Sequence, residues 1–267
     1  ETQVSRGARY QLVYESMREL ARREPTFAVH VHVGVGDPES AVELMNRMRA
    51  HLPLLLALSG NSPFWQGRDT GFSSARTPIF QAFPRVGIPR LFSSYEDYVE
   101  AVDLLLRCHT FPEPTFLWWD VRLQPSLGTV ELRIMDAQTN ATHTAVLAAV
   151  VQTIAHLELE EGYHSERLIE AFEILQENRF LAARDGMDAR LIDPVAERRV
   201  PALHQLEELV SAGLPHAQDL GCADAFELAV DLAHQTGAAW QRSVVHESGL
   251  PGLVERLSDT FTTADSL

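Results

Sequence analysis

The chain has 267 residues, of which 37 are acidic and 22 basic, so its formal net charge at pH 7 is −15. With 45% hydrophobic and 22% charged residues, its composition is that of a folded protein of one large or two small domains. Such an acidic protein repels nucleic acid backbones unless a local basic patch overrides the overall field. Even the apolar run Leu52–Leu58 is too short to span a membrane. We therefore expect neither nucleic acid nor a membrane as a partner.

The two cysteines, Cys108 and Cys222, lie far apart and outside any metal-binding spacing. They do not indicate a disulfide framework, and with no signal peptide at the start they favour a reducing, cytoplasmic location. The chain begins with Glu1 in place of methionine, and an amphipathic pattern starts almost at once. We therefore expect it to be a fragment of a longer protein.

The first half of the chain alternates helical and strand patterns. Apolar residues at helical spacing predict a helix over residues 4–23, closed by Pro25. Strict alternation then predicts a strand over Phe27–Val35, and Asp37 with Pro38 predicts the start of the next helix. The segment Ser59–Arg76 is rich in Gly, Ser, Asn and Asp and also contains aromatic residues, which indicates a long functional loop.

Further along, Ser94–Cys108 is expected to be a helix, and Phe116–Leu123 and Thr129–Met135 are expected to be strands of a hairpin. Everything beyond this hairpin has helical periodicity. We therefore predict an α+β protein with an antiparallel sheet and a helical C-terminal half, folded as a single domain over 1–267. The expected C-terminal helices are Ala141–Glu161, Ser165–Ala183, Pro201–Ala212, Asp224–Gln235 and Leu253–Phe261.

Two histidines on the first predicted strand are candidate functional residues. His30 and His32 are one pleat apart and share one face, where their imidazoles could bind a cation or contact phosphate oxygens. The same spacing also fits two hydrogen-bonded, half-buried histidines with a structural role.

The predicted hairpin offers a second set of polar residues. Glu131 and Arg133 share a face of one strand, and Asp120 and Arg122 share a face of the other. Paired arginines suit a carboxylate or phosphate because their forked donors match its oxygens. A solvated sheet face with weak ion pairs is the alternative.

The loop supplies a third set of donors, which could orient a small polar substrate or hold phosphates. Loops of this composition are also common as plain turns. The residues concerned are Asn61, Ser62, Asp69, Thr70, Ser73 and Arg76.

Together these segments resemble the carboxylate-amine ligase family, also called glutamate–cysteine ligase type 2, of the glutamine synthetase-like superfamily. The resemblance rests on motifs in the same order over most of the chain. They are H-V-H-V-G at 30–34, L-P-L-L-L-A-L-S-G-N-S-P-F-W-Q-G-R-D-T-G-F-S-S-A-R at 52–76, W-W-D-V-R at 118–122, T-V-E-L-R at 129–133, N-R-F-L-A-A-R-D-G-M-D-A-R-L-I-D-P at 178–194 and G-A-A-W-Q-R at 237–242.

The resemblance implies an ATP-dependent ligase that activates a carboxylate as an acyl phosphate and joins it to an amine, with Mg²⁺ or Mn²⁺ as cofactor. By similarity, His30 and Glu131 would bind the metal ion and His32 a nucleotide phosphate. Arg76 would hold the transferred phosphate, and Arg133 with Arg122 the substrate carboxylate or acyl phosphate.

Five further residues are implied as nucleotide or substrate contacts. They are Asn61, which would orient the substrate, and Asn178, Arg179, Arg184 and Arg242. The resemblance does not identify the amine, because an amine pocket depends on its shape and a few donors.

One departure from the family matters. Its members begin with a glutamate-rich strand of the form G-V-E-E-E-F, which supplies further metal ligands, and no such strand occurs here. The catalytic domain is therefore expected to lack its N-terminal strands, so that an N-terminal segment or a second chain is needed to complete the metal site. The chain is also a candidate for a homo-oligomer. The alternative function is a non-catalytic domain that binds a nucleotide or a protein.

Overall fold

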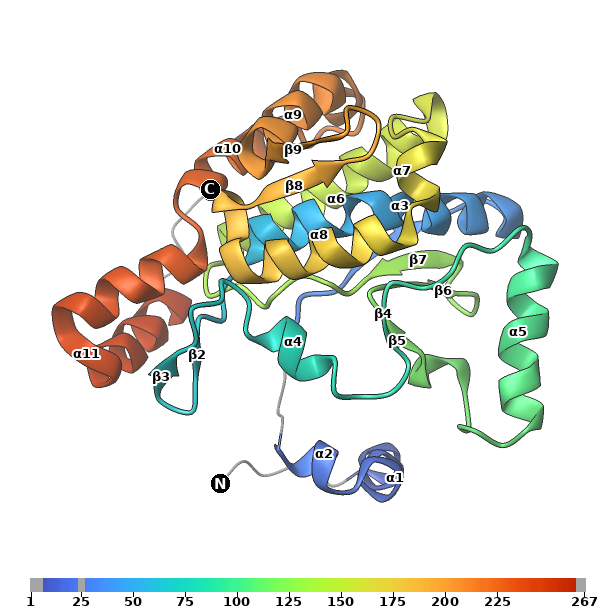
Figure 1. Cartoon of the computed structure of the whole chain (residues 1–267), viewed down its shortest axis with the longest axis horizontal. Coiled ribbons are helices and arrows are strands. Elements are labelled where there is room, and N and C mark those ends of the chain that lie inside the picture. The colour runs from blue at the N-terminus through green and yellow to red at the C-terminus, as the bar shows by residue number, and fades with distance from the viewer. Residues whose placement is uncertain (1–6, 24–26, 263–267) are drawn as a thin grey trace.

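The computed structural model describes residues 7–23 and 27–262. It contains a three-stranded antiparallel sheet with the order β1-β7-β6, formed by Val31–Gly34, Thr129–Leu132 and Val121–Gln124. The predicted hairpin is thus confirmed as β6–β7, with the histidine strand paired along the other edge of β7. The predicted α+β class, with small antiparallel sheets and a mainly helical second half, is also confirmed (Figure 1).

The long helix α3, Pro38–Ser59, lies at the centre of the molecule (Figure 1). Asp37 caps it by accepting hydrogen bonds from the backbone N–H groups of Glu39 and Ser40, as its position before Pro38 predicts. From Met48 to Ser59 every residue of the helix is buried, because the sheet packs on one side and other helices on the rest. The core is continuous from the sheet through α3 to the C-terminal helices.

The second half consists of helices that stack on α3 and on one another. Helix α6 packs against α3, α9 and α10, and α8 packs along α3. Helix α11 contains a kink at Gly249, whose φ of 69° lies in the left-handed region. Their bounds are Ala141–Glu161 (α6), Glu166–Glu170 (α7), Phe172–Asp185 (α8), Ala202–Asp219 (α9), Ala223–His234 (α10) and Gly237–Thr262 (α11).

Several predicted elements differ in extent. Within 4–23 the chain forms two helices, α1 (Ala8–Met17) and α2 (Glu19–Arg23), because Arg18 adopts a positive φ; residues 4–6 and Pro25 lie outside the described residues. The strand predicted over Phe27–Val35 is shortened to β1, and Ala28 makes only an isolated bridge to Asp136.

The strand predicted over Phe116–Leu123 is divided. It contains the end of the 3₁₀ turn η1 (Pro114–Phe116), then β5 (Trp118–Trp119), which pairs in parallel with β4 (Val86–Gly87), and then β6. The loop also has structure of its own. The loop over Ser59–Arg76 contains the strands β2 (Phe64–Trp65) and β3 (Arg68–Asp69), and helix α4 (Arg76–Phe80) follows it. The helix predicted over Ser94–Cys108 is α5, Tyr95–Arg107.

The helix predicted over Ser165–Ala183 breaks at Ala171, whose ψ of 70° is not helical. Sequence periodicity also missed a hairpin of β8 (Arg190–Asp193) and β9 (Arg198–Pro201), preceded by the turn η2 (Gly186–Asp188). In the described part of the chain no helix combines the length and apolarity that a membrane crossing requires. Both cysteines are free, as predicted.

Candidate active site around Glu131

The strand register places three polar side chains in one row across the sheet. His32 on β1 and Arg122 on β6 are both the direct neighbours of Glu131 on the central strand β7. Residues directly opposite one another in an antiparallel pair project to the same face. The apolar residues that alternate with them, such as Val130 and Leu132, are fully buried in the core. This alternation leaves a polar sheet face centred on Glu131.

The carboxylate of Glu131 receives hydrogen bonds at both oxygens. Arg122 Nε and Gln124 Nε2 donate to Oε2 at 2.7 and 2.9 Å, and Arg133 Nη1 donates to Oε1 at 2.6 Å. His30 Nδ1 lies 3.1 Å from Oε1. Strands distant in sequence are thus joined at a single carboxylate.

His32 lies at the margin of this cluster. Its Nε2 is 3.7 Å from Glu131 Oε1, and its Nδ1 is 2.9 Å from Thr129 Oγ1. The two histidines therefore do share a face, and 35% of each side chain is exposed.

The charges of the cluster set its protonation. Burial would raise the pKa of Glu131, but hydrogen bonds from His30 and Arg122 and the charge of Arg133 together hold that pKa well below its usual value. Burial, together with the charges of Arg133 and Arg122, lowers the pKa of His30 despite the opposing effect of Glu131. The site therefore combines an ionised carboxylate with a neutral imidazole.

A cavity of about 770 Å³ opens over this cluster. It is lined by His30, Glu131 and the three arginines predicted to act in catalysis, and its walls include Phe80, Phe83 and Trp118. Arg133 is mostly buried, and its Nε has no hydrogen-bond partner. The predicted arginines that line it are Arg76, Arg122 and Arg133, and Arg9 of α1 lines it as well.

Arg76 enters the cavity from the loop and is held by Asp136, a residue that the sequence did not single out. Arg76 Nε donates to Asp136 Oδ1 at 2.8 Å, and its Nη2 donates to the backbone carbonyl of Ile134. Asp136 also accepts from Ser62 Oγ and Ser74 Oγ at 2.7 and 2.8 Å. Its position shortly after the T-V-E-L-R motif, beyond Ile134 and Met135, was the available signal.

Asn61 lies in a neighbouring cavity of about 400 Å³, which shares Arg76 as a wall residue with the larger one. Gln241 Nε2 donates to the backbone and side-chain oxygens of Asn61, each at 2.7 Å. A Cβ atom at Gly237 would stand 1.9 Å from Asn61 Oδ1, so the close approach of α11 requires glycine there. From the motif G-A-A-W-Q-R, only Arg242 was predicted as a site residue, and Gln241 was not.

The remaining predicted residues make other contacts. Asn178 bonds in both directions to the backbone of Ile192, and Arg179 Nε donates to the buried Asp120 at 2.6 Å. Asp120 therefore pairs with helix α8 and not with the arginines of the hairpin. Arg184 pairs with its neighbour Asp185, and Arg242 pairs with Asp69 of the loop. None of these four predicted residues lines the Glu131 cavity.

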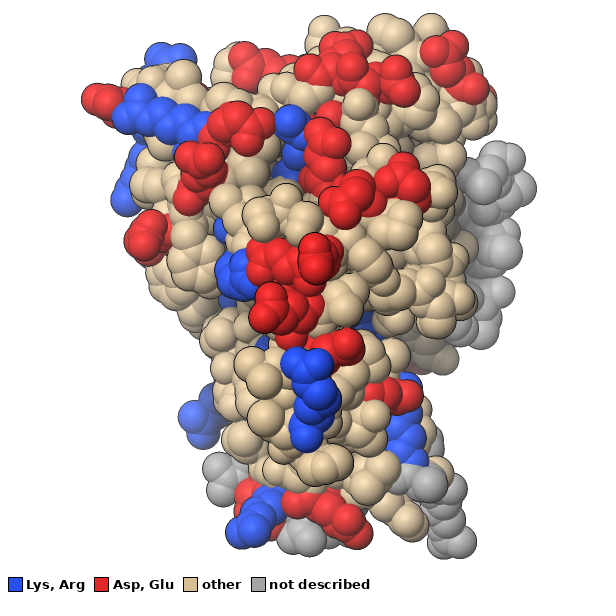
Figure 2. Space-filling view, turned by 90° about the vertical axis from the view of Figure 1, so that its right-hand side faces the viewer, with Lys and Arg blue, Asp and Glu red and all other residues tan. Residues whose placement is uncertain are grey.

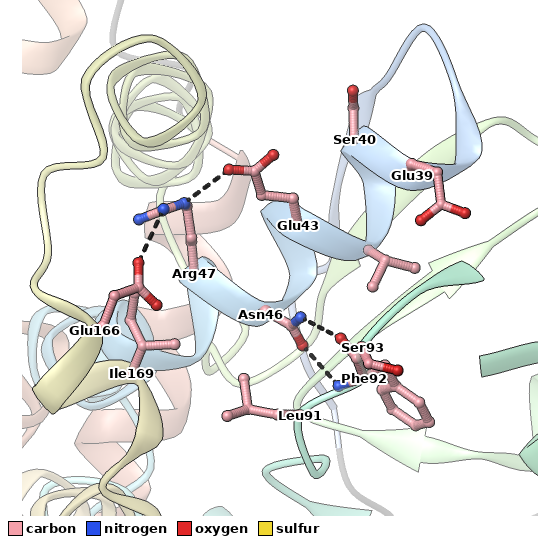
Figure 3. Close-up of a pocket in the computed structure, with 11 residues that line it drawn as sticks. Glu39, Ser40, Glu43, Asn46, Arg47, Leu91, Phe92, Ser93, Glu166 and Ile169 are labelled. Atoms are coloured by element: carbon pink, nitrogen blue, oxygen red, sulfur yellow. Dashed lines mark hydrogen bonds and ion pairs between the residues drawn. The ribbon is translucent and has the colours of Figure 1, made fainter. Parts of the chain in front are cut away.

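Another cavity, of about 370 Å³, lies beside the first turns of α3 (Figure 3). Its polar side chains satisfy one another: Arg47 bridges Glu43 and Glu166 at 3.2 and 3.0 Å, and Asn46 holds the backbone of Phe92 in both directions. It contains none of the predicted site residues. We therefore interpret its polar contacts as structural, because they link α3 to α7 and to the segment before α5.

The Glu131 cavity fits an anion together with a divalent cation. Arg122 and Arg133 bring two positive charges and Glu131 one negative charge, while the Arg76–Asp136 pair is balanced. The excess positive charge and the forked donors of arginine suit phosphate or carboxylate oxygens. One carboxylate and a neutral imidazole are a partial ligand set for Mg²⁺, which usually keeps waters and phosphate oxygens as its other ligands.

Comparison with known proteins identifies the same family that the sequence motifs resemble. A family model described as glutamate-cysteine ligase family 2 matches residues 1–256. Two proteins of Rubrobacter xylanophilus, named "Putative glutamate--cysteine ligase 2-1" and "Putative glutamate--cysteine ligase 2-3", are each 41% identical to this chain. The matches cover 93% and 97% of this chain, and 66% and 70% of those proteins. The chain thus spans about two thirds of the length of these relatives.

A solved structure shares the fold. The crystal structure of glutamate–cysteine ligase from Francisella tularensis in complex with AMP superposes with a TM-score of 0.57 at 15% sequence identity. The match covers 86% of this chain and 60% of that one. At this identity the likeness concerns the architecture.

Proposed function

We propose, from the premise that this chain belongs to the glutamate–cysteine ligase family 2, that it is the catalytic part of an ATP-dependent carboxylate-amine ligase. Its substrates would be glutamate or a similar amino acid and an amine such as cysteine. The observation that carries the proposal is the cavity in which His30, Glu131 and three arginines meet. That set of side chains suits a nucleotide phosphate, a divalent cation and a carboxylate held side by side.

The proposed reaction has two steps. A carboxylate oxygen of the amino acid attacks the γ-phosphorus of ATP, and ADP leaves. The amine nitrogen then attacks the carbonyl carbon of the acyl phosphate, inorganic phosphate leaves, and the nitrogen loses a proton. ATP cleavage thereby drives amide formation, and the protein's task is to align and neutralise the reacting oxygens.

The arginines would have separate tasks. Arg133, whose side chain lines the cavity, would donate to the substrate carboxylate and to the charge that develops on it. Arg122 Nε donates to Glu131, and its Nη1 donates to the carbonyls of Thr115 and Leu117. These contacts favour a role for Arg122 in positioning Glu131. Arg76 has only some of its guanidinium N–H groups left for a transferred phosphate, because the others donate to Asp136 and to the carbonyl of Ile134.

His30 and Glu131 would hold Mg²⁺ or Mn²⁺, and His32 would contact a nucleotide phosphate. When bound, the metal ion would withdraw charge from the phosphate oxygens. Two protein ligands leave its shell to be completed by waters, by phosphate oxygens and by carboxylates from a preceding segment or a second chain. A cytoplasmic location belongs to the same proposal, since ATP and reduced thiols are available there.

Isotope transfer tests the chemistry directly. The chain is assayed alone and joined to any in-frame segment encoded upstream, with ATP, Mg²⁺, cysteine and glutamate labelled with ¹⁸O in its carboxylates. We expect phosphate release that needs both amino acids, and one ¹⁸O atom in the released phosphate. Release of phosphate without the label would exclude an acyl phosphate as the intermediate.

A non-catalytic nucleotide-binding domain is the second candidate, favoured by the protein donors that already occupy both oxygens of Glu131. It predicts ATP binding without turnover, even when any upstream segment is present. Glu131→Gln separates this case further, because it keeps the size and loses the charge. It should abolish turnover in the ligase, whereas in a binding module it would change only the affinity for MgATP.

A further inference from the structure

A second cluster of potential metal ligands lies away from the Glu131 cavity. It consists of His51 from the middle of α3, Glu158 near the end of α6 and His164 from the segment between α6 and α7. One ligand atom from each residue lies within 4.8 Å of the others. Among the residues that the structure describes, this is the one group of three that meets this criterion. The proposed ligase reaction makes no use of it.

The contacts within the cluster are short. His51 Nε2 is 2.5 Å from Glu158 Oε1, and the backbone N–H of His164 donates to the same oxygen at 3.2 Å. The rings of His51 and His164 lie against each other with centroids 4.3 Å apart. Three segments of the chain are therefore already gathered around a single carboxylate.

The cluster has unused binding capacity at a fully buried atom. The side chains of His51 and Glu158 are both 0% exposed, and Glu158 Oε2 has no hydrogen-bond partner. His51 Nδ1 also has none, but Nε2 is the ring nitrogen that faces Glu158. A buried charge requires a close partner or a metal ion, because desolvation is expensive. The nearest guanidinium nitrogen is Arg47 Nη1, 3.6 Å from Glu158 Oε2, and Arg47 also serves Glu43 and Glu166 (Figure 3).

We propose that His51, Glu158 and His164 form a binding site for Zn²⁺. Two imidazoles and one carboxylate are a ligand set typical of zinc sites with an open fourth position, whereas Mg²⁺ prefers a shell of oxygens. Zinc bonds are about 2.0–2.2 Å long, so ligand atoms around one ion are at most about 4 Å apart. Closing the cluster on zinc therefore requires side-chain shifts of about 1 Å.

The surroundings provide access to the site. His51 and His164 line a cavity of about 660 Å³, so the fourth position can take a water molecule from it. The bound ion would connect α3 and α6 to the segment that leads into α7. We therefore expect zinc to stabilise the folded chain, because the unfolded chain does not hold the three ligands together.

Zinc titration of metal-free protein tests the proposal. Protein is stripped with a chelator, and Zn²⁺ is then titrated in competition with a chromophoric chelator while thermal unfolding is followed in parallel. We expect one tight equivalent of Zn²⁺ and a rise in Tm. In His164→Gln, which keeps the buried His51–Glu158 pair, affinity should fall by about 100-fold or more, exceeding the loss typical of outer-shell partners.

Two control variants make the result specific. His204→Gln changes a histidine that lines the same cavity but lies outside the cluster, and it should bind zinc like the unmodified protein. His30→Gln removes a histidine from the Glu131 cavity and should also keep the tight equivalent. Loss of that equivalent in His30→Gln with retention in His164→Gln would place the zinc at Glu131 and overturn the proposal.

Anomalous diffraction at the zinc edge provides a test that needs no variant. Crystals of the unmodified protein grown with ZnCl₂ should show a peak between His51, Glu158 and His164. A structure in which Zn²⁺ is absent from that position, with His51 still bonded to Glu158, would show a closed buried pair. The proposal would then be wrong, whether or not the chain proves to be a ligase.

Discussion

At the scale of single residues, the polar groups of the sheet face divide into those that are fully engaged and those with capacity left. Both oxygens of Glu131 accept from protein donors, and Arg122 donates from its Nε and Nη1 to protein acceptors, while the buried Nε of Arg133 has no partner. A buried donor without a partner costs about 1–3 kcal/mol in a folded protein. Arg133 also lines the cavity, so a ligand that turns its guanidinium and accepts from this Nε would recover that cost, which makes Arg133 the arginine to test first.

Arg133→Lys should lower turnover in the assay of the proposed ligase by about 10²–10³-fold, because an ammonium group cannot reproduce the forked donors. Thermal stability should change little, since the charge beside Glu131 is kept. Steady-state phosphate release and thermal unfolding are measured on the same preparations, with Arg190→Lys on the exposed hairpin as the control. Near-normal turnover would reject a catalytic role, and parallel loss of turnover and stability would indicate a structural one.

Arg179 is expected to act through stability. Its side chain and that of Asp120 are both mostly buried, so Arg179→Met leaves an uncompensated carboxylate and should cost about 3–5 kcal/mol. The double variant Asp120→Asn/Arg179→Met should be more stable than Arg179→Met in urea unfolding. Arg167→Met, from an exposed pair with Glu197, should cost at most about 1 kcal/mol. Unchanged stability together with weakened ATP binding would return Arg179 to the nucleotide site.

At the scale of secondary-structure elements, α5 packs its apolar side against α3 and the segment that contains Phe92. Tyr98 on this helix is 3% exposed and lies edge-on to Phe92. Burial raises the pKa of Tyr98 to about 12, with Tyr95 adding to the rise and Arg122 opposing it. Ionising this hydroxyl in the folded protein is therefore costly.

The consequence is a loss of stability at alkaline pH. The unfolded chain releases the Tyr98 proton near pH 10 and the folded chain near pH 12, so the folded state binds more protons between these values. The contribution of Tyr98 to the free energy of unfolding should be constant below about pH 10 and fall by about 2–3 kcal/mol towards pH 12. Urea unfolding at several pH values should show this fall in the unmodified chain and in the exposed Tyr10→Phe, but not in Tyr98→Phe. An equal fall in Tyr98→Phe would contradict it.

At the scale of the whole molecule, the negative charge must be reconciled with the anionic substrates of the proposed ligase. Figure 2 shows one face of the molecule, on which acidic side chains gather in groups with arginines between them. The overall field therefore repels a nucleotide, and the three arginines of the Glu131 cavity supply the local attraction. A divalent cation carried with the nucleotide would reduce the repulsion further.

The continuous core predicts that the chain unfolds as one unit. Helix α3 contacts the sheet, α6 and α8, so neither half buries its apolar surface alone. Far-UV circular dichroism and tryptophan fluorescence should give coincident urea transitions. Because tryptophans lie in the loop, the sheet region and α11, a separately folding half would produce two transitions and disprove the single domain.

The sequence alone determined the elements whose pattern is local. The alternation from His30 to His32, the hairpin of β6 and β7, the cap at Asp37 and the helical second half all follow from periodicity and turn chemistry. Apolar alternation also fixed which face of the sheet is polar, because a shift by one residue would bury Glu131 without its partners.

The tertiary structure decided the partners of each charged group, because these depend on contacts between residues far apart in the chain. Asp136 as the anchor of Arg76, the pairing of Arg179 with Asp120, and the place of Gln241 beside Asn61 join segments separated by 59 to 180 positions. His51 shows the same limit. Its neighbours in sequence are those of a buried apolar helix, and only the packing of α6 against α3 brings Glu158 to it.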